Sequence, residues 1–330
     1  MMDQLISRFT EQLEEALSIA DNSELSISTK DINKVYVAGL GGSGIGGDFV
    51  REFIREESEI PYLGGKGYTI PNYIDKHTLA IVSSYSGNTE ETVSQYDYLM
   101  RTGAQILVIS SGGKLIEMAK SNNQDHILIP ANWPSPRACL GYSVILQLGV
   151  LEKLGIIGEK ALDDVRNSIR LLNTEESEIK SEAEKIASSL YQKIPIIYST
   201  ELNEAVGVRW RQQINENSKL LCWHHVIPEM NHNELVGWKD KNEDFVVVYL
   251  RNDDDHDRSV KRIEINQEII QPLCGQILEV HSKGKSLIEK SLYLVHLGDW
   301  VSWYLAELRG VDAIEVNVID YLKSELAKFH

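Results

Sequence analysis

Two short loops rich in glycine and serine have the composition of an anion-binding site. The first runs from Gly39 to Asp48 and follows an apolar stretch that begins at Val35. The second runs from Tyr85 to Thr89 and follows the strand-like stretch 79–84, which ends in Ser84. In both, a glycine-containing turn leads from an apolar run into a helical pattern, so that the N–H groups of a helix start can meet an anion. The sequence therefore predicts an anionic ligand.

Serine and threonine hydroxyls in these loops add short donors that suit a phosphate group. A second hydroxyl-rich turn of this kind is not needed by a dinucleotide, and it favours a phosphorylated small molecule. The alternative is that Ser86 or Asn88 only caps the N-terminus of the following helix. The candidate phosphate ligands are Gly42, Ser43, Ser84, Ser86 and Thr89.

A dinucleotide site is the competing interpretation, because the glycines of the first loop also fit the G-x-G-x-x-G pattern. Such a site needs an acid at the end of the next strand to bind a ribose hydroxyl. Here the next apolar run, 60–63, is followed by Gly64 and further glycines, whereas Glu56, Glu57 and Glu59 precede it. The acids therefore stand at the wrong end of the strand, and the sequence favours a sugar phosphate.

The two loops carry a resemblance to a known family. Gly41-Gly42-Ser43-Gly44-Ile45, followed by Ser84-Tyr85-Ser86-Gly87-Asn88-Thr89, resembles the pair of loops in sugar isomerase (SIS) domains, which bind phosphorylated sugars. The motif order and chain length resemble more narrowly the bifunctional phosphoglucose/phosphomannose isomerases, over most of the chain. The resemblance implies an aldose-ketose isomerase that interconverts fructose 6-phosphate with glucose 6-phosphate and mannose 6-phosphate through an enediol. It implies neither a metal nor a redox cofactor.

Apolar runs alternate with helical patterns along the chain and indicate an α/β protein with doubly wound parallel sheets. A helix over residues 3–20 comes first, and a second strand series lacks a glycine-rich loop, as a degenerate repeat would. At 330 residues the chain suits two domains, 1–155 with the phosphate loops and 156–330 as the isomerase half. Both loops follow strand ends, where such sheets bind ligands. The expected strands lie near 35–39, 60–63, 79–84, 105–110, 126–129, 194–198, 220–226, 245–250 and 277–280.

Three residues outside the loops are candidates for a part in the chemistry. Arg137 follows a proline-rich segment, where a lone arginine is otherwise a surface charge or a member of a structural pair. Glu216 lies near the end of a helical stretch, 202–219, where the helix dipole disfavours a carboxylate, and a salt bridge with Lys219 or Arg209 is the alternative. His232 can exchange protons near neutral pH, or it is a loop histidine bonded to a neighbour.

The resemblance assigns roles to these residues. The family pattern places a glutamate in E-N-x-K, a histidine in N-H-N-E and a lysine in a late L-K, which correspond to Glu216, His232 and Lys323. Glu216 would move the proton between C2 and C1, and Arg137 would stabilise the enediolate oxygen. His232 would open the sugar ring, reaching in from a second subunit of a homodimer, and Lys323 would assist. One departure is Ile314, which stands where the family has a threonine linked to the acceptance of both C2 epimers, so glucose 6-phosphate is the more secure substrate.

Composition narrows the function classes further. Asp and Glu outnumber Lys and Arg by 49 to 33, and the net charge of −16 disfavours nucleic acid and anionic membranes as partners. Three cysteines without metal-binding spacing, and no long apolar run, suggest a cytoplasmic protein with no membrane span. A non-catalytic SIS regulatory protein that binds sugar phosphates is the main alternative. A hexosamine synthase is disfavoured, because its glutaminase half needs an N-terminal cysteine and residues 1 and 2 are methionine.

Overall fold

The computed structural model describes residues 1–329, which form two compact units. The N-terminal unit consists of Ser7–Thr174 and Gly284–Leu292, and the C-terminal unit consists of Met1–Ile6, Glu175–Lys283 and the chain from Tyr293 onward. This division differs from the sequence-based one at residue 155, because two long helices contribute residues to both units. These helices are α7 (Lys160–Leu190) and α10 (Leu287–Arg309).

The N-terminal unit is built on a parallel sheet with the strand order β2-β1-β3-β4-β5. Its register sets Ala38 beside Val82, and Val82 beside Val108, so the ends of the three central strands are level. Strand order reverses between β1 and β3, which makes their carboxyl ends the topological switch point where such sheets bind ligands. The strands are β1 (Lys34–Ala38), β2 (Tyr62–Gly65), β3 (Thr78–Ser83), β4 (Gln105–Ser110) and β5 (Asp125–Leu128).

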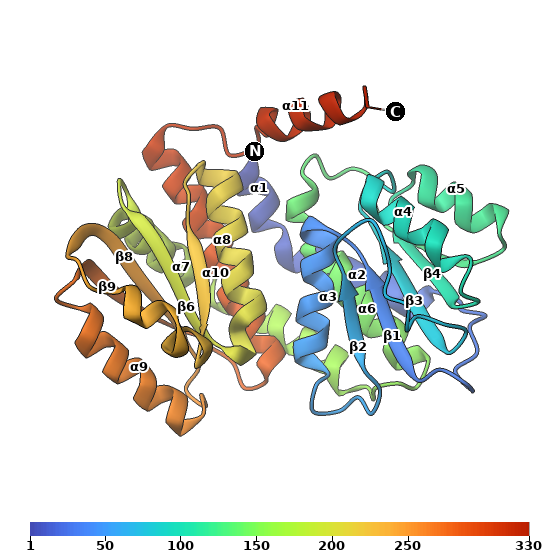
Figure 1. The fold of residues 1–330 in the computed structure, drawn as a ribbon, viewed down its shortest axis with the longest axis horizontal. Coiled ribbons are helices and arrows are strands. Elements are labelled where there is room, and N and C mark those ends of the chain that lie inside the picture. Colours follow the sequence, from blue (N-terminus) through green and yellow to red (C-terminus); the bar gives the residue numbers. More distant parts are fainter. Residues whose placement is uncertain (330) are drawn as a thin grey trace. The chain divides into compact units, whose positions relative to one another are not determined.

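Helices cover both faces of this sheet (Figure 1). Tyr36, Val82 and Val108 pack on one face against α4 (Glu90–Leu99) and α5 (Gly113–Ser121). On the other face, α3 (Gly41–Phe53) approaches the sheet closely enough for Gly47 to meet Val37. Behind α3 come α6 (Leu140–Lys153) and α2 (Phe9–Asn22), which contact one another. Because both faces are covered, every residue of β3 is buried, as its continuous apolar run predicts.

The C-terminal unit repeats this plan with four parallel strands in the order β7-β6-β8-β9. Residues of β6 and β8 pack against α9 (Asp257–Ile270) on one face. Helix α8 (Glu204–Ser218) connects β6 to β7 and contacts both strands. The α/β class with two doubly wound parallel sheets is therefore confirmed. The strands are β6 (Ile194–Thr200), β7 (Trp223–Ile227), β8 (Asn242–Arg251) and β9 (Cys274–His281).

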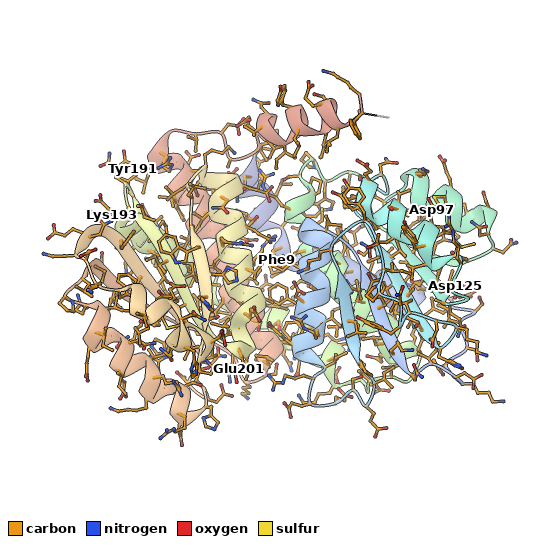
Figure 2. The ribbon with its side chains drawn as sticks, viewed as in Figure 1. Phe9, Asp97, Asp125, Tyr191, Lys193 and Glu201 are labelled. Atoms are coloured by element: carbon orange, nitrogen blue, oxygen red, sulfur yellow. The ribbon has the colours of Figure 1, made fainter. Side chains whose placement is uncertain are left out.

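The ends of the chain differ in detail from the sequence prediction. The helix expected over residues 3–20 is divided at Arg8 into α1 (Met2–Ser7) and α2. The last helix, α11 (Asn317–Leu326), has no buried residue. Asp125, labelled in Figure 2, accepts hydrogen bonds from Ser26 and Ile27 and so ties the segment before β1 to β5. Among residues 1–329, no helix combines the length and the apolar composition needed to cross a membrane.

Candidate active site

The glycine-rich loop after β1 forms the N-terminus of α3. Leu40 is the extended N-cap residue, and Gly41 has a φ of +53°, in the left-handed region that favours glycine. The first turn of α3 contains no acidic residue that would repel an anion. Gly42 and Ser43 lie in this turn and are partly exposed. The turn therefore presents backbone N–H groups and one hydroxyl at the start of α3, and its binding of an anion remains a prediction.

The serine-rich loop after β3 ends at Thr89, the N-cap residue of α4. The hydroxyls of Thr89 and Ser84 lie 2.9 Å apart and share a hydrogen bond. The interpretation of Ser86 or Asn88 as the cap is wrong, because the Ser86 hydroxyl instead accepts a hydrogen bond from the Asn88 N–H at 3.2 Å. Ser86 is exposed and Ser84 is buried. Two of the predicted phosphate ligands, Ser84 and Thr89, are thus in direct contact.

The loops after β1, β3 and β4 meet at the carboxyl edge of the sheet. Gly87, with a φ of +67°, lies so close to the loop after β4 that a Cβ added there would be 1.9 Å from the carbonyl oxygen of Gly112. Ser43 accepts a hydrogen bond at its carbonyl from Ser143 of α6, at 3.3 Å. A cavity of about 10 Å³, room for about one water, is lined by Ser43 and Tyr85 among others. The structure therefore brings the two predicted phosphate loops side by side.

Arg137 belongs to the same cluster of loops. It lies in a short 3₁₀ helix, η1 (Pro136–Ala138), just before α6. A Cβ added to Gly42 would be 3.5 Å from the carbonyl oxygen of Pro136 and 3.9 Å from the Cα of Arg137. The interpretation of Arg137 as a surface charge is wrong, because its side chain is buried. Arg137 is therefore a cationic residue next to the glycine-rich loop.

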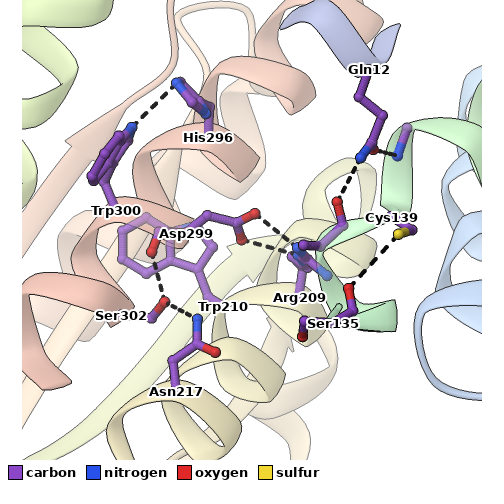
Figure 3. Close-up of polar contacts among 12 residues, drawn as sticks. Gln12, Ser135, Cys139, Arg209, Trp210, Asn217, His296, Asp299, Trp300 and Ser302 are labelled. Atoms are coloured by element: carbon purple, nitrogen blue, oxygen red, sulfur yellow. Dashed lines mark hydrogen bonds and ion pairs between the residues drawn. The ribbon is translucent and has the colours of Figure 1, made fainter. Parts of the chain in front are cut away.

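In the C-terminal unit, Glu216 lies in the last turn of α8, which hydrogen bonds hold against α10 (Figure 3). The amide of Asn217 donates to the Ser302 hydroxyl at 2.9 Å, and the Ser218 hydroxyl donates to the Ser302 carbonyl at 2.7 Å. Lys219 ends the helix and donates to the carbonyl oxygen of Glu216 at 2.6 Å. These bonds fix the backbone of Glu216, although α10 was not expected to take part.

A cavity of about 450 Å³ opens beside Glu216. Its wall is mainly apolar and includes Leu221, Val318 and Ile319, with Lys219 and Glu315 as further charged residues. Glu216 itself is half-buried. The carboxylate therefore stands at the border of a space large enough for a small molecule, which suits a group that exchanges protons with a ligand.

His232 lies at the end of η3 (Glu229–His232), in a loop that polar contacts hold firmly. The amide of Asn231 donates to Asn266 at 2.7 Å, and Glu234 accepts hydrogen bonds from Tyr198 and Trp223. The His232 side chain is exposed and has no hydrogen-bond partner within residues 1–329. The alternative that it is bonded to its neighbours is therefore wrong, since Asn233 and Glu234 bond to other groups.

The structure does not bring His232 and Glu216 together within one C-terminal unit. Helix α8 leads from the carboxyl end of β6 to the amino end of β7, and Glu216 lies at that amino edge. His232 follows the carboxyl end of β7. Because β7 has five residues, the two edges are about 16 Å apart. Lys323 lies on the exposed helix α11, which contributes Val318 and Ile319 to the cavity beside Glu216.

A histidine on β7 gives this unit a pH-dependent stability. Burial, together with the nearby charges of Arg211 and His225, lowers the pKa of His224 from 6.5 to about 4. As the pH falls from 6.5 towards 4, the unfolded chain binds a proton at this residue that the folded chain does not bind. The free energy of unfolding therefore falls in this window. We expect His224→Gln to lose less unfolding free energy than the wild type between pH 7 and pH 4.5, as measured by urea unfolding. Parallel plots of unfolding free energy against pH for the two proteins would contradict this.

Comparisons with known proteins agree with this geometry. The SIS domain model matches residues 29–132, and the model described as "Bacterial phospho-glucose isomerase C-terminal SIS domain" matches residues 179–326. Among solved structures, the C-terminal domain of glucosamine-fructose-6-phosphate aminotransferase from Francisella tularensis has a TM-score of 0.76 at 13% identity and covers 94% of this chain and 97% of its own. Tagatose-6-phosphate ketose/aldose isomerase from Escherichia coli has a TM-score of 0.69 at 13% identity, covering 96% and 95%. These structures share the fold.

Curated relatives are more similar in sequence. A protein of Caldicellulosiruptor bescii named bifunctional phosphoglucose/phosphomannose isomerase is 38% identical, over 99% of each chain. Proteins of the same name from Aquifex aeolicus and Thermoplasma volcanium are 35% and 36% identical, over 96% and 95% of this chain and 99% of each of theirs. Identity at this level over nearly the whole length confirms the resemblance recognised in the two loops. This chain belongs to the family of bifunctional phosphoglucose/phosphomannose isomerases.

Proposed function

We propose that this protein is an aldose-ketose isomerase that interconverts fructose 6-phosphate with glucose 6-phosphate and mannose 6-phosphate. The observation that carries the proposal is the cluster of two hydroxyl-bearing loops and a buried arginine at the switch point of the first sheet. Relatives with this chain's length are named for the same two activities. Because these relatives are named as enzymes, the non-catalytic regulatory alternative has no support.

In this proposal the N-terminal unit binds the phosphate group. The first turn of α3 supplies backbone N–H groups, and the Ser84–Thr89 pair supplies hydroxyl donors that turn towards the phosphate on binding. The buried charge of Arg137 stabilises the negative oxygen of the enediolate. The proposed phosphate ligands are Gly42, Ser43, Ser84, Ser86 and Thr89.

The C-terminal unit supplies the proton-transfer groups. Glu216 removes a proton from C2 of the aldose and returns it to C1, so that no proton acceptor other than the carboxylate is needed for this step. His232 and Lys323 exchange protons with the ring oxygen and the anomeric hydroxyl when the ring opens. The exposure of His232, and its lack of a hydrogen-bond partner within residues 1–329, leave its imidazole available for this task.

We further propose a homodimer in which His232 of one subunit serves the Glu216 of the other. The separation of Glu216 and His232 at opposite edges of the second sheet supports this arrangement, because one copy of the unit cannot place both on one small sugar. Exposed apolar side chains of the C-terminal unit, such as Leu221 and Val236, are available for a subunit contact. We also propose a cytoplasmic location, which suits the three buried cysteine thiols, Cys139, Cys222 and Cys274.

Mixing two inactive variants tests the shared site. Glu216→Gln and His232→Ala are each expected to be inactive as homodimers. When they are unfolded and refolded together, half of the dimers are mixed, and each mixed dimer carries one intact site. We therefore expect recovery of about a quarter of the wild-type activity. Formation of mixed dimers, checked with two affinity tags, without any recovery would contradict the exchange of His232 between subunits.

The experiment that tests the function itself is product analysis with fructose 6-phosphate. The proposal predicts that glucose 6-phosphate and mannose 6-phosphate both form. Ile314 bears on their ratio, because its side chain offers no hydroxyl where the family has a threonine. Its backbone N–H donates to the Asp312 carboxylate at 2.8 Å, which fixes the turn before α11. Formation of neither hexose phosphate would contradict the proposed function.

A further inference from the structure

The hydroxyl of Tyr85 connects the serine-rich loop to the segment that carries Arg137. Tyr85 stands between Ser84 and Ser86, two of the proposed phosphate ligands. Its hydroxyl accepts a hydrogen bond from the Trp133 N–H at 3.0 Å and lies 3.1 Å from the carbonyl oxygen of Pro130, to which it donates. A single side chain thus reaches from one functional loop to the backbone of the next.

The main chain of Tyr85 is itself held in place. Its carbonyl oxygen accepts hydrogen bonds from the Ser111 hydroxyl at 2.6 Å and from the Ser111 N–H at 3.0 Å. The Ser110 hydroxyl donates a third hydrogen bond to the same carbonyl oxygen, at 3.3 Å. These serines end β4 and begin the loop after it. The tyrosine is therefore anchored at its backbone to the sheet edge and at its hydroxyl to the arginine segment.

The arginine segment is held at its other end by α2. The buried amide of Gln12 donates to the Ala138 carbonyl at 2.7 Å and accepts from the Gly141 N–H at 2.8 Å, as Figure 3 shows for its two contacts. At the Tyr85 end of the segment, Trp133 is buried and its indole N–H donates to the Tyr142 hydroxyl at 3.0 Å. The backbone around Arg137 is therefore fixed from both sides, with Tyr85 providing the attachment on the phosphate side.

We propose that the Tyr85 hydroxyl is a positioning group for the isomerase reaction, which sets Arg137 relative to the phosphate-binding loop. The inference rests on the proposed function, because it concerns the placement of the cation that stabilises the enediolate. The carbon chain of a sugar phosphate limits the distance between its phosphate and its carbonyl carbon, so the two loops must stay within a matching distance of one another. Small displacements of a charge from the reacting atoms lower turnover strongly.

The chemistry of the hydroxyl fits this task. A tyrosine O–H can donate and accept at the same time, and here it accepts from the Trp133 N–H while the carbonyl oxygens of Pro130 and Trp133, at 3.1 Å and 3.3 Å, share its proton. Burial raises the pKa of Tyr85 to about 12, so the hydroxyl keeps its proton at neutral pH and remains a donor. Phenylalanine would keep the ring but leave the Trp133 N–H without this partner.

The test compares Tyr85→Phe with Tyr96→Phe, a matched loss of a hydroxyl. Tyr96 of α4 is buried in the same unit. Its hydroxyl donates to the side-chain oxygen of Gln124 at 2.8 Å, away from the loop cluster. We expect Tyr85→Phe to lower kcat by about tenfold to a hundredfold, with a change in KM for fructose 6-phosphate of less than about twofold. Tyr96→Phe should lower the Tm to a similar degree and leave kcat unchanged. Gln12→Met, at the other end of the segment, should share the kinetic pattern of Tyr85→Phe.

Combining Tyr85→Phe with Arg137→Ala shows whether the tyrosine acts through the arginine. If it does, the tyrosine substitution has less than about a twofold further effect on kcat once Arg137 is gone. The same fold loss in both backgrounds would overturn the inference, as would an unchanged kcat in a folded Tyr85→Phe protein. A rise in KM alone would also overturn it. Absence of turnover in the wild type overturns the proposed function and, with it, the inference, whereas an active wild type isolates the role of Tyr85.

Discussion

Replacement of Glu216 by Gln is expected to lower isomerase turnover by about a thousandfold or more. The amide has nearly the shape of the carboxylate but cannot accept the proton from C2, so chemistry is lost while the cavity keeps its form. The backbone of residue 216 is held by Lys219 and by the neighbouring bonds of Asn217 and Ser218 to α10, none of which involves the side-chain carboxylate. Loss of activity with an unchanged thermal melt would report on chemistry rather than on folding. Steady-state kinetics together with a thermal melt measure both.

Glu315→Gln is the matched control for this variant. Glu315 is half-buried, lines the same cavity and accepts a hydrogen bond from Lys219 at its carbonyl, at 2.7 Å. We expect this variant to keep its turnover within about tenfold of the wild type, because its carboxylate is assigned no proton transfer. If Glu315→Gln were inactive and Glu216→Gln active, the two assignments would be reversed.

Asp299→Ala is expected to lower the free energy of unfolding by about 3–5 kcal/mol. Arg209 of α8 donates to Asp299 of α10 through Nε at 3.0 Å and through a terminal nitrogen at 2.8 Å. The two side chains are 2% and 8% exposed, so the alanine variant leaves a guanidinium charge buried opposite a void. The pair also holds α8, the helix that carries Glu216 in its last turn, so turnover should fall together with stability. Urea unfolding followed by circular dichroism measures the change.

The double variant Arg209→Leu/Asp299→Leu distinguishes two contributions to the free energy of unfolding. One is the destabilisation by a buried charge that has lost Asp299, and the other is the stabilisation by the ion pair itself. We expect it to be more stable than Asp299→Ala, because a leucine pair leaves no buried charge. An exposed pair on α9, Lys261 and Glu264 at 2.8 Å, provides the comparison, and its removal should cause no measurable change. Equal destabilisation by the single and double variants would show that lost packing, rather than the unpaired charge, dominates.

The sequence predicts the first sheet well because its signals are local. Apolar runs bounded by glycine and serine locate β1 and β3, and the hydroxyls beside them locate the phosphate loops. A parallel strand that is buried on both faces is a continuous apolar run in the sequence. It can therefore be recognised without information about tertiary contacts. The same local signal located β6 and β8 in the C-terminal unit. The resemblance to SIS domains rests on these loops, and the identity with curated relatives over nearly the whole length shows the family.

The supports of the site could not be predicted in the same way. Gln12 and Tyr85 act on residues around Arg137 through contacts between segments that are far apart in the sequence. No periodic pattern marks a buried amide or a tyrosine hydroxyl as a backbone partner, and the sequence places Gln12 only within the helix expected over residues 3–20. The opposite placement of Glu216 and His232 likewise depends on the direction of α8 between two parallel strands. The spacing of two motifs in the sequence does not show at which edge of a sheet each motif lies.

Isomerisation of fructose 6-phosphate in heavy water tests the central claim most directly. The account predicts glucose 6-phosphate and mannose 6-phosphate that carry deuterium at C2, because the proton on Glu216 exchanges with solvent before it is returned to the sugar. The signal should disappear in Glu216→Gln, while the substrate still raises the Tm of that variant. Binding of fructose 6-phosphate without product, and without deuterium at either carbon in the wild type, would contradict the enediol isomerase and leave a protein that only binds sugar phosphates.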